Sequence, residues 1–483
     1  MFAFDVSQYD FTDSDISEAV VGSRLLSMEI ECNSACNYRC AYCYASNGTG
    51  FLPDLPVETV FSAIREAHAL GTRKIVILGG EPLLYKPLSQ VIEQINGLGM
   101  GCEIFTNASL LTSELAAMLA THNTRVVIKY NSLDADVQDR MCGVADAFAK
   151  ANQAINLLRE NGLTEPGRLV ASTVICTENL DGLPALWRYL RQNGIKPYFE
   201  ILTPQGRLLC HRNLLVSPER LESLFNELAA IDHEFGFHWE PQPPLVGGKC
   251  LRHTYSCLLN VKGEIMPCVG LDIPIGKWGE RPLADILASS AIMQDLKNHR
   301  NTIKGPCRTC EKADSCYGCR GTAYQVTGDY LASDPYCWRN AGKCPDHNLF
   351  PVDTSDLVPH RPPMRMVECI ETLGDESTIG MVIRPDNRFC DSNGVLSPAA
   401  LPELAAQACA AADSFRHNGL VPQGMLTSCS NIQVLEQLKI GDRIHIHVKE
   451  ASAFENFHVS VFRFTKDDGT LCATGELTLC SVD

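Results

Sequence analysis

Residues 31–45 read ECNSACNYRCAYCYA and contain three cysteines, Cys36, Cys40 and Cys43, at a C-x3-C-x2-C spacing. The apolar run LLSMEIECN at residues 25–33 leads into them and ends at an Asn, which is typical of a strand. The three thiols therefore lie on one loop at the end of a predicted strand. Three thiolates on one loop can hold three irons of a 4Fe-4S cube and leave the fourth iron open to another ligand.

A zinc site is the alternative for this triplet. Zinc usually has four protein ligands when it is structural, and a histidine commonly joins three cysteines. The first histidine of the chain is His68, well beyond the loop. The sequence therefore favours an iron-sulfur cluster over zinc at these three cysteines.

The surrounding sequence, from about residue 24 to 240, alternates short apolar runs with longer amphipathic ones. Strands are predicted at residues 25–33, 74–80, 101–107, 125–134, 169–176 and 197–203. Helices are predicted between them, including residues 56–71, 87–99 and 146–162, and each of these stretches ends at Gly. Regular alternation of strand and helix predicts an α/β fold with a parallel sheet, and six repeats suit a partial, TIM-like (β/α)6 barrel.

Active residues of such folds gather at the carboxyl ends of the strands. The predicted strands end in or near polar and small residues at these positions: Cys36, Gly80, Glu81, Thr106, Asn107, Asn131, Ser132 and Glu200. We therefore expect these residues to surround one site.

The segment LGGEPLL at residues 78–84 follows the second predicted strand. Gly79 and Gly80 permit close approach of another backbone, and Glu81 supplies a carboxylate. Taken alone, GGEP most simply predicts a loop turn. Its place one strand away from the cysteine triplet favours a functional loop instead.

Together, the triplet and the GGEP segment resemble the radical SAM family, and Tyr42 matches the aromatic residue before the last cysteine. The resemblance implies that the open iron chelates S-adenosylmethionine (SAM) and that Gly79, Gly80 and Glu81 contact its ammonium group. It also implies that Asn107 and Ser132 contact SAM, although both residue types are common turn formers. The activity implied is reductive cleavage of SAM to a 5′-deoxyadenosyl radical that removes hydrogen from a substrate, with a flavodoxin or ferredoxin-type reductant.

Residues 245–347 no longer show the alternation of predicted strands and helices, and they are rich in Cys, Gly and Pro. Two sets of four cysteines stand out there, and a zinc ribbon is one interpretation of their C-x2-C pairs. Beside a radical SAM triplet they resemble the SPASM extension, which holds two auxiliary 4Fe-4S clusters and so implies three clusters in all. By that resemblance one cluster is bound by Cys250, Cys257, Cys268 and Cys319, and the other by Cys307, Cys310, Cys316 and Cys337. Cys344 is an alternative to Cys337 as the last ligand.

Composition excludes several classes of protein. The chain of 483 residues has 45% hydrophobic and 20% charged residues and a net charge of -16, which disfavours a nucleic-acid partner. It contains no run approaching the roughly 20 apolar residues of a membrane helix. The acidic start MFAFDVSQYDFTDSD does not resemble a secretion signal, so we expect a cytoplasmic protein whose 23 cysteines stay reduced. Single cysteines such as Cys102, Cys142, Cys176, Cys210, Cys409 and Cys472 are expected to be small core residues.

The part of the chain that follows residue 350 predicts an α+β domain. Residues 397–419 form one clear predicted helix, framed by Ser397, Pro398 and Gly419, and alternating strands follow at residues 443–450 and 457–465. The opening LVPHRPPMRMVECIE and the helix sequence ELAAQACAA resemble hotdog-fold dehydratases that act on 3-hydroxyacyl groups carried by acyl carrier protein.

His360 and Glu403 match positions where those dehydratases keep polar residues, and they are the candidate catalytic pair of this domain. Glu403 and Gln407 lie one turn apart on an otherwise Ala-rich helix. The HFPG segment of the commoner dehydratases is replaced here by FCDSNGV. The domain is therefore a dehydratase, an inactive module for binding or dimerisation, or a thioesterase-like enzyme. The resemblance also implies a homodimer.

The expected organisation is a radical SAM barrel at residues 1–244, a SPASM domain at 245–350 and a hotdog domain at 351–483. The predicted activity is radical SAM oxidation of a small or carrier-bound acyl substrate. One alternative is a maturase that modifies a ribosomally made peptide. The other, from a different class, is a cluster-bearing electron-transfer protein without radical chemistry.

Overall fold

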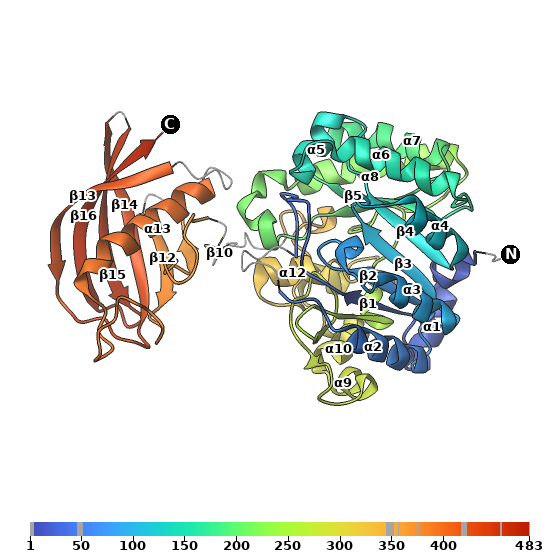
Figure 1. Cartoon of the computed structure of the whole chain (residues 1–483), viewed down its shortest axis with the longest axis horizontal. Helices are drawn as coiled ribbons and strands as arrows, with labels where there is room; N and C mark the ends of the chain where they lie inside the picture. The colour runs from blue at the N-terminus through green and yellow to red at the C-terminus, as the bar shows by residue number, and fades with distance from the viewer. Residues whose placement is uncertain are drawn as a thin grey trace. The chain divides into compact units, whose positions relative to one another are not determined.

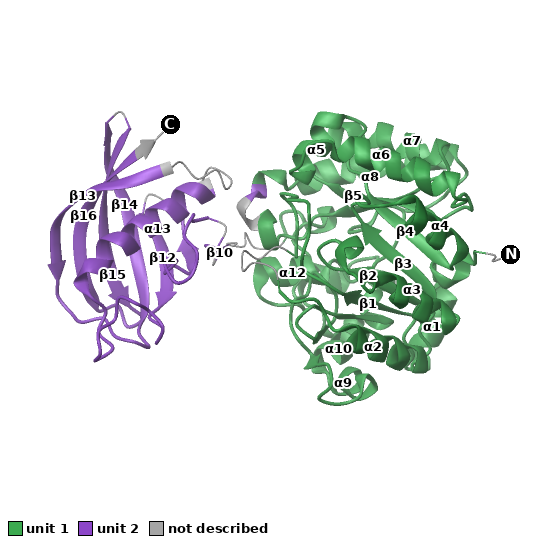
Figure 2. Cartoon of the chain, viewed as in Figure 1, with its two compact units in different colours: residues 1–46, 50–208, 213–347 green, residues 47–49, 209–212, 348–483 purple. Residues whose placement is uncertain are grey.

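The computed structural model describes residues 4–45, 52–343, 352–355, 357–373, 376–416, 423–454 and 456–482. The chain divides into two compact units, coloured separately in Figure 2. Residues 1–46, 50–208 and 213–347 make the first unit, and residues 47–49, 209–212 and 348–483 make the second. Each unit has a hydrophobic core of its own.

Six parallel strands form the centre of the first unit (Figure 1). They are β1 (Ser27–Glu31), β2 (Lys74–Leu78), β3 (Gly101–Thr106), β4 (Thr124–Lys129), β5 (Leu169–Ile175) and β6 (Lys196–Ile201). Their order in the sheet is β6-β5-β4-β3-β2-β1, so every strand lies beside its neighbour in the sequence. This confirms the predicted α/β fold with a partial barrel of six strands.

The cysteine-rich segment extends the same sheet. Strand β7 (Ser256–Leu259) runs parallel to β1, and an antiparallel ribbon of β8 (Glu264–Met266) and β9 (Gly276–Lys277) continues beyond it. The described residues 245–343 therefore belong to the same compact unit as the barrel. The expected domain boundaries at residues 244 and 350 stay predictions.

Helices connect the strands and cover one face of the sheet (Figure 1). In the barrel they are α1 (Asp13–Val21), α2 (Val57–Ala69), α3 (Leu88–Gly97), α4 (Ser113–Thr121), α5 (Ala135–Cys142), α6 (Ala147–Glu160), α7 (Leu183–Gln192) and α8 (Pro218–Glu234). The cysteine-rich segment adds α9 (Leu283–Ser289), α10 (Ala291–Lys297), α11 (His299–Thr302) and α12 (Arg320–Thr327).

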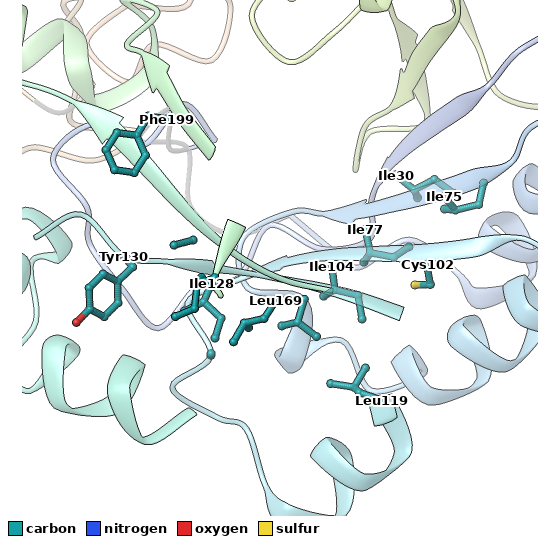
Figure 3. Packing of buried hydrophobic residues seen from close by; sticks show 14 of the residues in the cluster. Ile30, Ile75, Ile77, Cys102, Ile104, Leu119, Ile128, Tyr130, Leu169 and Phe199 are labelled. Atoms are coloured by element: carbon teal, nitrogen blue, oxygen red, sulfur yellow. The ribbon is translucent and has the colours of Figure 1, made fainter. Parts of the chain in front are cut away.

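The core between sheet and helices is built by alternate strand residues, as Figure 3 shows for Ile30, Ile77, Ile104 and Ile128. All four are buried. Because side chains alternate along a strand, the residues between them point to the opposite, barrel-facing side. Burial of each such Ile contributes about 1.5–3 kcal/mol to stability.

The amino ends of the strands are closed by a buried charge network. Arg125, 2% exposed, donates to Asp10 Oδ1 at 2.7 Å and to Glu103 Oε1 at 3.4 Å. Lys74 Nζ also donates to Glu103, at 2.7 Å. These charged groups lie at the amino ends of the strands, opposite the carboxyl ends where the site is expected.

The second unit is an antiparallel sheet with one long helix. Its strands are β10 (Val352–Asp353), β11 (Cys369–Thr372), β12 (Glu376–Val382), β13 (Gln423–Val434), β14 (Arg443–Phe454), β15 (Phe457–Lys466) and β16 (Leu471–Val482), in the order β10-β11-β12-β14-β15-β16-β13. Helix α13 (Leu401–Arg416) packs its apolar side against the sheet. This confirms the predicted α+β arrangement; Gly419, expected just after the helix, lies outside the described residues.

The contact between α13 and the sheet is close because small side chains form it. Ala405, Ala408 and Ala411 are fully buried on the helix, opposite Ile446 and Phe464 of the sheet.

In the described part of the chain, no helix combines the length and apolarity needed to cross a bilayer.

Candidate active site

A cavity of about 270 Å³ lies in the first unit, at the carboxyl ends of the parallel strands. Its wall comes from the ends of β2 to β6, from the cysteine loop after β1 and from the cysteine-rich segment. The predicted site residues on this wall are Cys36, Cys40, Tyr42, Cys43, Gly79, Gly80, Glu81, Thr106, Asn107, Glu200, Cys250, Cys268 and Cys319. The cavity therefore brings together residues from three separate parts of the sequence.

The cysteine loop forms one side of the cavity. Cys36, Cys40 and Cys43 are each half-buried, and a backbone hydrogen bond of 3.2 Å from Cys43 N to Cys40 O closes a turn between the last two. Gly143 at the end of α5 supports the loop from behind, because a Cβ there would overlap the Arg39 carbonyl. The fold thus presents all three thiols to one space.

The GGEP loop is held against the cysteine loop by backbone hydrogen bonds. Gly80 N donates to Asn33 O, and Glu81 N donates to Ala35 O, both at 2.8 Å. Gly79 has φ +141°, and a Cβ at Gly80 would overlap the backbone of Ala35. The two glycines are therefore required by the close crossing of the two loops.

Glu81 is buried beneath this crossing, with 1% of its surface exposed. Its carboxylate accepts from Thr106 Oγ1 at 2.5 Å, Asn107 N at 2.8 Å and Leu83 N at 3.0 Å. Burial raises the pKa of Glu81, and these three hydrogen bonds oppose that rise. Glu81 therefore ties the ends of β2 and β3 together as well as lining the cavity.

Asn107 and Tyr42 line the cavity, and Ser132 does not. Asn107 Nδ2 donates to Asn37 Oδ1 at 2.9 Å and lies 3.9 Å from Cys36 Sγ, so it stands beside the cysteine loop. Tyr42 Oη accepts from Asn131 Nδ2 at 2.8 Å. Ser132 Oγ instead accepts from Asp134 N at 3.0 Å in the turn that leads into α5.

Charged residues that sequence reasoning did not select also reach the cavity. Lys129, the last residue of β4, lies over the Tyr42 ring at 5.3 Å and donates to Ser172 Oγ at 3.2 Å. Arg252 donates to Glu29 Oε1 at 2.7 Å. The lysine directly after the apolar run at residues 126–128 was the available sequence signal for Lys129. No local pattern marked Arg252.

Two further residues near the cysteine loop were not predicted from the sequence to belong to the site. Burial raises the pKa of Glu31, the last residue of β1, to about 7, although Tyr44 donates a hydrogen bond to it. Cys142, expected to be an ordinary core cysteine, is buried behind the loop and hydrogen bonds to Cys40. Both are close in space to the triplet but lie outside its sequence motif.

The first auxiliary set reaches the cavity with three of its four predicted cysteines. Cys250, Cys268 and Cys319 line it. Burial, together with the nearby thiols of Cys319 and Cys250, raises the pKa of Cys268 to about 12. Cys257, the fourth predicted ligand, is instead buried in the core between the sheet and the helices.

The second auxiliary set lies close together in the segment after α11. Burial raises the pKa of Cys337, and Cys307 and Cys316 are near enough to add to this rise. Asn340 Nδ2 donates to Cys307 Sγ at 3.1 Å, while Cys310 follows Cys307 by one turn. Cys344, the alternative to Cys337, lies outside the described residues.

The donor sets fit iron-sulfur clusters. In the described part of the chain, no three His, Cys, Asp or Glu side chains are arranged to hold a single metal ion. An iron-sulfur cluster needs a wider spacing of its ligands than a single metal ion does, because each thiolate binds a separate iron. The three cysteines of one loop line the cavity, and the side-chain amide of Asn107 donates a hydrogen bond toward Cys36 Sγ.

The candidate catalytic pair of the second unit is also brought together. His360 Nε2 lies 3.3 Å from Glu403 Oε1. Gln407 donates to the same carboxylate oxygen at 2.8 Å and to Met364 O at 2.8 Å, and it accepts from Met366 N at 3.0 Å. Gln407 thus orients Glu403 and fastens α13 to the segment that follows His360.

Three family models match parts of the chain. Residues 30–190 match the radical SAM superfamily, whose members use SAM and a 4Fe-4S cluster. Residues 250–311 match SPASM, an iron-sulfur cluster-binding domain that holds auxiliary clusters. Residues 352–483 match the model described as ApeP dehydratase.

Curated relatives cover the first unit. The AdoMet-dependent heme synthase of Methanosarcina barkeri is 26% identical over 351 residues, which cover 66% of this chain and 97% of the relative. The PqqA peptide cyclase of Granulibacter bethesdensis is 26% identical over 332 residues, covering 64% of this chain and 85% of the relative.

Solved structures share the fold of the first unit. SuiB of Streptococcus suis bound to S-adenosylmethionine has a TM-score of 0.51 and 17% identity, over 69% of this chain and 84% of that one. The structure described as native anSMEcpe with bound AdoMet has a TM-score of 0.53 and 15% identity, over 65% of this chain and 94% of that one.

Proposed function

Since the chain is an enzyme with a radical SAM domain, a SPASM domain and an ApeP-like dehydratase domain, we propose that it cleaves SAM reductively to oxidise a small or carrier-bound acyl substrate. One observation carries this proposal. Cys36, Cys40 and Cys43 face the same cavity as the Gly79-Gly80-Glu81 loop, at the carboxyl ends of the strands. This is where a parallel α/β sheet places its catalytic residues.

The three thiolates would hold a 4Fe-4S cluster, which when bound supplies the electron that splits SAM to methionine and a 5′-deoxyadenosyl radical. The chain's own residues would position SAM. Glu81 keeps the loop in place from below, while the cation of Lys129 and the amide of Asn107 face the cavity from β4 and the end of β3. We propose that Lys129 attracts the SAM carboxylate and that the enclosed barrel keeps water from the radical.

The auxiliary cysteines support two further clusters, for a total of three. Cys250, Cys268 and Cys319 share the cavity with the triplet, so an auxiliary cluster there would lie close to the substrate. Such a cluster would take an electron from the substrate after hydrogen removal, which suits a net oxidation. A flavodoxin or ferredoxin-type protein would supply the electron for the first cluster.

The test of this function is incubation of the anaerobically reconstituted chain with SAM and dithionite. We expect 5′-deoxyadenosine as a product, measured by chromatography. Its absence would overturn the proposed SAM cleavage and favour the alternative of a cluster-bearing electron-transfer protein.

A peptide substrate is the second candidate, and relatives favour it. A PqqA peptide cyclase is among the curated relatives, and SuiB has also been solved with the precursor peptide SuiA. Supplying candidate peptides and acyl-carrier thioesters in parallel separates the two proposals. The true substrate is expected to raise 5′-deoxyadenosine formation and to incorporate or lose hydrogen at one carbon.

The second unit is proposed to bind an acyl thioester through the groups around His360 and Glu403. In a dehydration, His360 would accept a proton from the carbon beside the thioester, and Glu403 would protonate the hydroxyl that leaves as water. The distance of 3.3 Å between His360 Nε2 and Glu403 Oε1 allows the two groups to act on one substrate.

Substitution of Glu403 tests this role. We expect Glu403→Gln to lower dehydration of a 3-hydroxyacyl thioester by at least about 100-fold, because the proton donor is lost. Glu376→Gln, at an exposed ion pair with Arg463 in the same unit, should retain activity. Thioester absorbance measures both. If the unsubstituted chain shows no dehydration but binds the thioester, the domain is a binding module.

A homodimer through the second unit is also proposed. Met425, Cys480, Phe457 and Phe454 are successive cross-strand partners on β13, β16, β15 and β14. Phe454 on β14 is 74% exposed, and Met425 on the edge strand β13 is 60% exposed. An exposed apolar row that runs across the strands to the edge of the sheet favours pairing with a second copy. Light scattering should then give twice the mass of one chain.

A further inference from the structure

The first auxiliary set lacks its fourth cysteine at the cavity. Cys250, Cys268 and Cys319 line the wall, but Cys257 lies on β7 opposite Met28 of β1, and both are packed in the helix-facing core. Cys257 is 1% exposed. Its neighbour Ser256 points to the other face, where its Oγ accepts a hydrogen bond from Ser27 Oγ at 2.9 Å.

Cys257 cannot reach the cavity without a change of register. Side chains alternate along a strand, so turning Cys257 to the barrel side would turn Ser256 and Leu258 toward the helices. The backbone pairing of β7 with β1 over four residues opposes such a shift. The cavity therefore holds three thiols of this set, and a cluster there needs another ligand.

His253 lies on the cavity wall three residues after Cys250. The imidazole is buried, with 2% of the residue exposed. Its Nδ1 is 2.8 Å from Tyr317 Oη, and its Nε2 is buried with no hydrogen-bond partner in the described part of the chain. A buried ring nitrogen without a hydrogen-bond partner on the wall of a cavity points to a bound ligand.

The surroundings of His253 match those of a metal-ligating histidine. A metal-ligating histidine usually donates a hydrogen bond from one ring nitrogen. The other ring nitrogen is then unprotonated and points to the metal. Tyr317 Oη also accepts from the backbone N of His253, at 3.4 Å. The C-x2-H spacing of Cys250 and His253 is that of two ligands on one tight turn, and the backbone bond from Thr254 N to Leu251 O at 3.0 Å forms that turn.

We propose that His253 Nε2 joins Cys250, Cys268 and Cys319 as the fourth ligand of the auxiliary cluster, and that Cys257 is not a ligand. The inference rests on the proposed function only in requiring that this cluster exists. A neutral imidazole in place of a thiolate makes the cluster less negative and raises its reduction potential. The cluster nearest the substrate would then be the better electron acceptor of the two auxiliary clusters.

The test uses the full chain with Cys36, Cys40 and Cys43 replaced by Ala, so that the auxiliary clusters give the signal. The protein is reconstituted anaerobically, reduced with dithionite and labelled with ¹⁵N-histidine. Pulsed electron paramagnetic resonance should show a directly coupled nitrogen that changes with the label. In the same background, His253→Cys should remove that coupling, keep the iron and lower the midpoint potential.

Iron analysis supplies the matched comparison. Cys257→Ala should retain the iron and the coupled nitrogen, whereas Cys250→Ala should lose about four irons per chain. Auxiliary clusters without any coupled nitrogen, or loss of iron in Cys257→Ala, would overturn the inference alone. A chain that holds zinc or no cluster at these cysteines would overturn both the inference and the auxiliary clusters of the proposed function.

Discussion

Replacement of Cys40 by alanine is expected to reduce 5′-deoxyadenosine formation to below about a hundredth of the unsubstituted rate, because the first cluster loses one of three ligands. Cys40 is the middle thiol of the loop and faces the cavity. Iron content should fall by about four per chain, while the auxiliary clusters remain. Chromatography of the SAM products and iron analysis measure the two effects.

Cys32→Ala is the matched control for this substitution. Cys32 is four residues before Cys36 but is fully buried in the core with Ile30 and Ile77. Its loss should cost stability of about 1–2 kcal/mol without removing iron or SAM cleavage. Equal loss of SAM cleavage in both variants would contradict the role assigned to Cys40.

Gly80→Ala is expected to displace the cysteine loop and to lower both iron content and SAM cleavage. A Cβ at this position would overlap backbone atoms of Ser34 and Ala35, directly before Cys36. Backbone cannot move aside as a flexible side chain can, so we expect a destabilisation of about 3 kcal/mol or more. Chemical denaturation and iron analysis provide the measurements.

Gly97→Ala is the control for this glycine. A Cβ at Gly97 meets nothing within 4 Å, and the residue is the last one of helix α3. Alanine there should leave iron binding unchanged and stabilise the chain by up to about 1 kcal/mol. If Gly80→Ala behaves like Gly97→Ala, the close crossing of the two loops does not support the cysteine loop.

The barrel could be predicted from the sequence because its signals are local. Each of the six strands is a short apolar run that ends near a polar or small residue, and the structure forms all six. The cavity residues that belong to motifs, such as Cys36 and Glu81, follow from the same positions. The helix of the second unit was equally clear from its sequence. Ser397 caps the 3₁₀ turn Pro398–Ala400 that leads into α13, and its Oγ accepts a hydrogen bond from Ala399 N at 3.3 Å.

Contacts between distant segments could not be predicted from these signals. Spacing alone does not tell which face of β7 Cys257 occupies, because that depends on the register of β7 against β1. The role of His253 as a candidate ligand could not be predicted either, because Tyr317, which hydrogen bonds to its Nδ1, lies 64 residues later in the sequence. Arg252 likewise reaches the cavity through an ion pair with Glu29, 223 residues away in the sequence.

The central claim is that Cys36, Cys40 and Cys43 hold a cluster whose free iron faces the cavity and binds SAM. The most direct measurement is electron paramagnetic resonance of the anaerobically purified, reduced chain before and after addition of SAM, with metal analysis of the same sample. The account predicts iron and a spectral change on SAM addition that disappears in Cys40→Ala. Zinc in place of iron at these thiols, or a cluster spectrum that SAM does not alter, would contradict it.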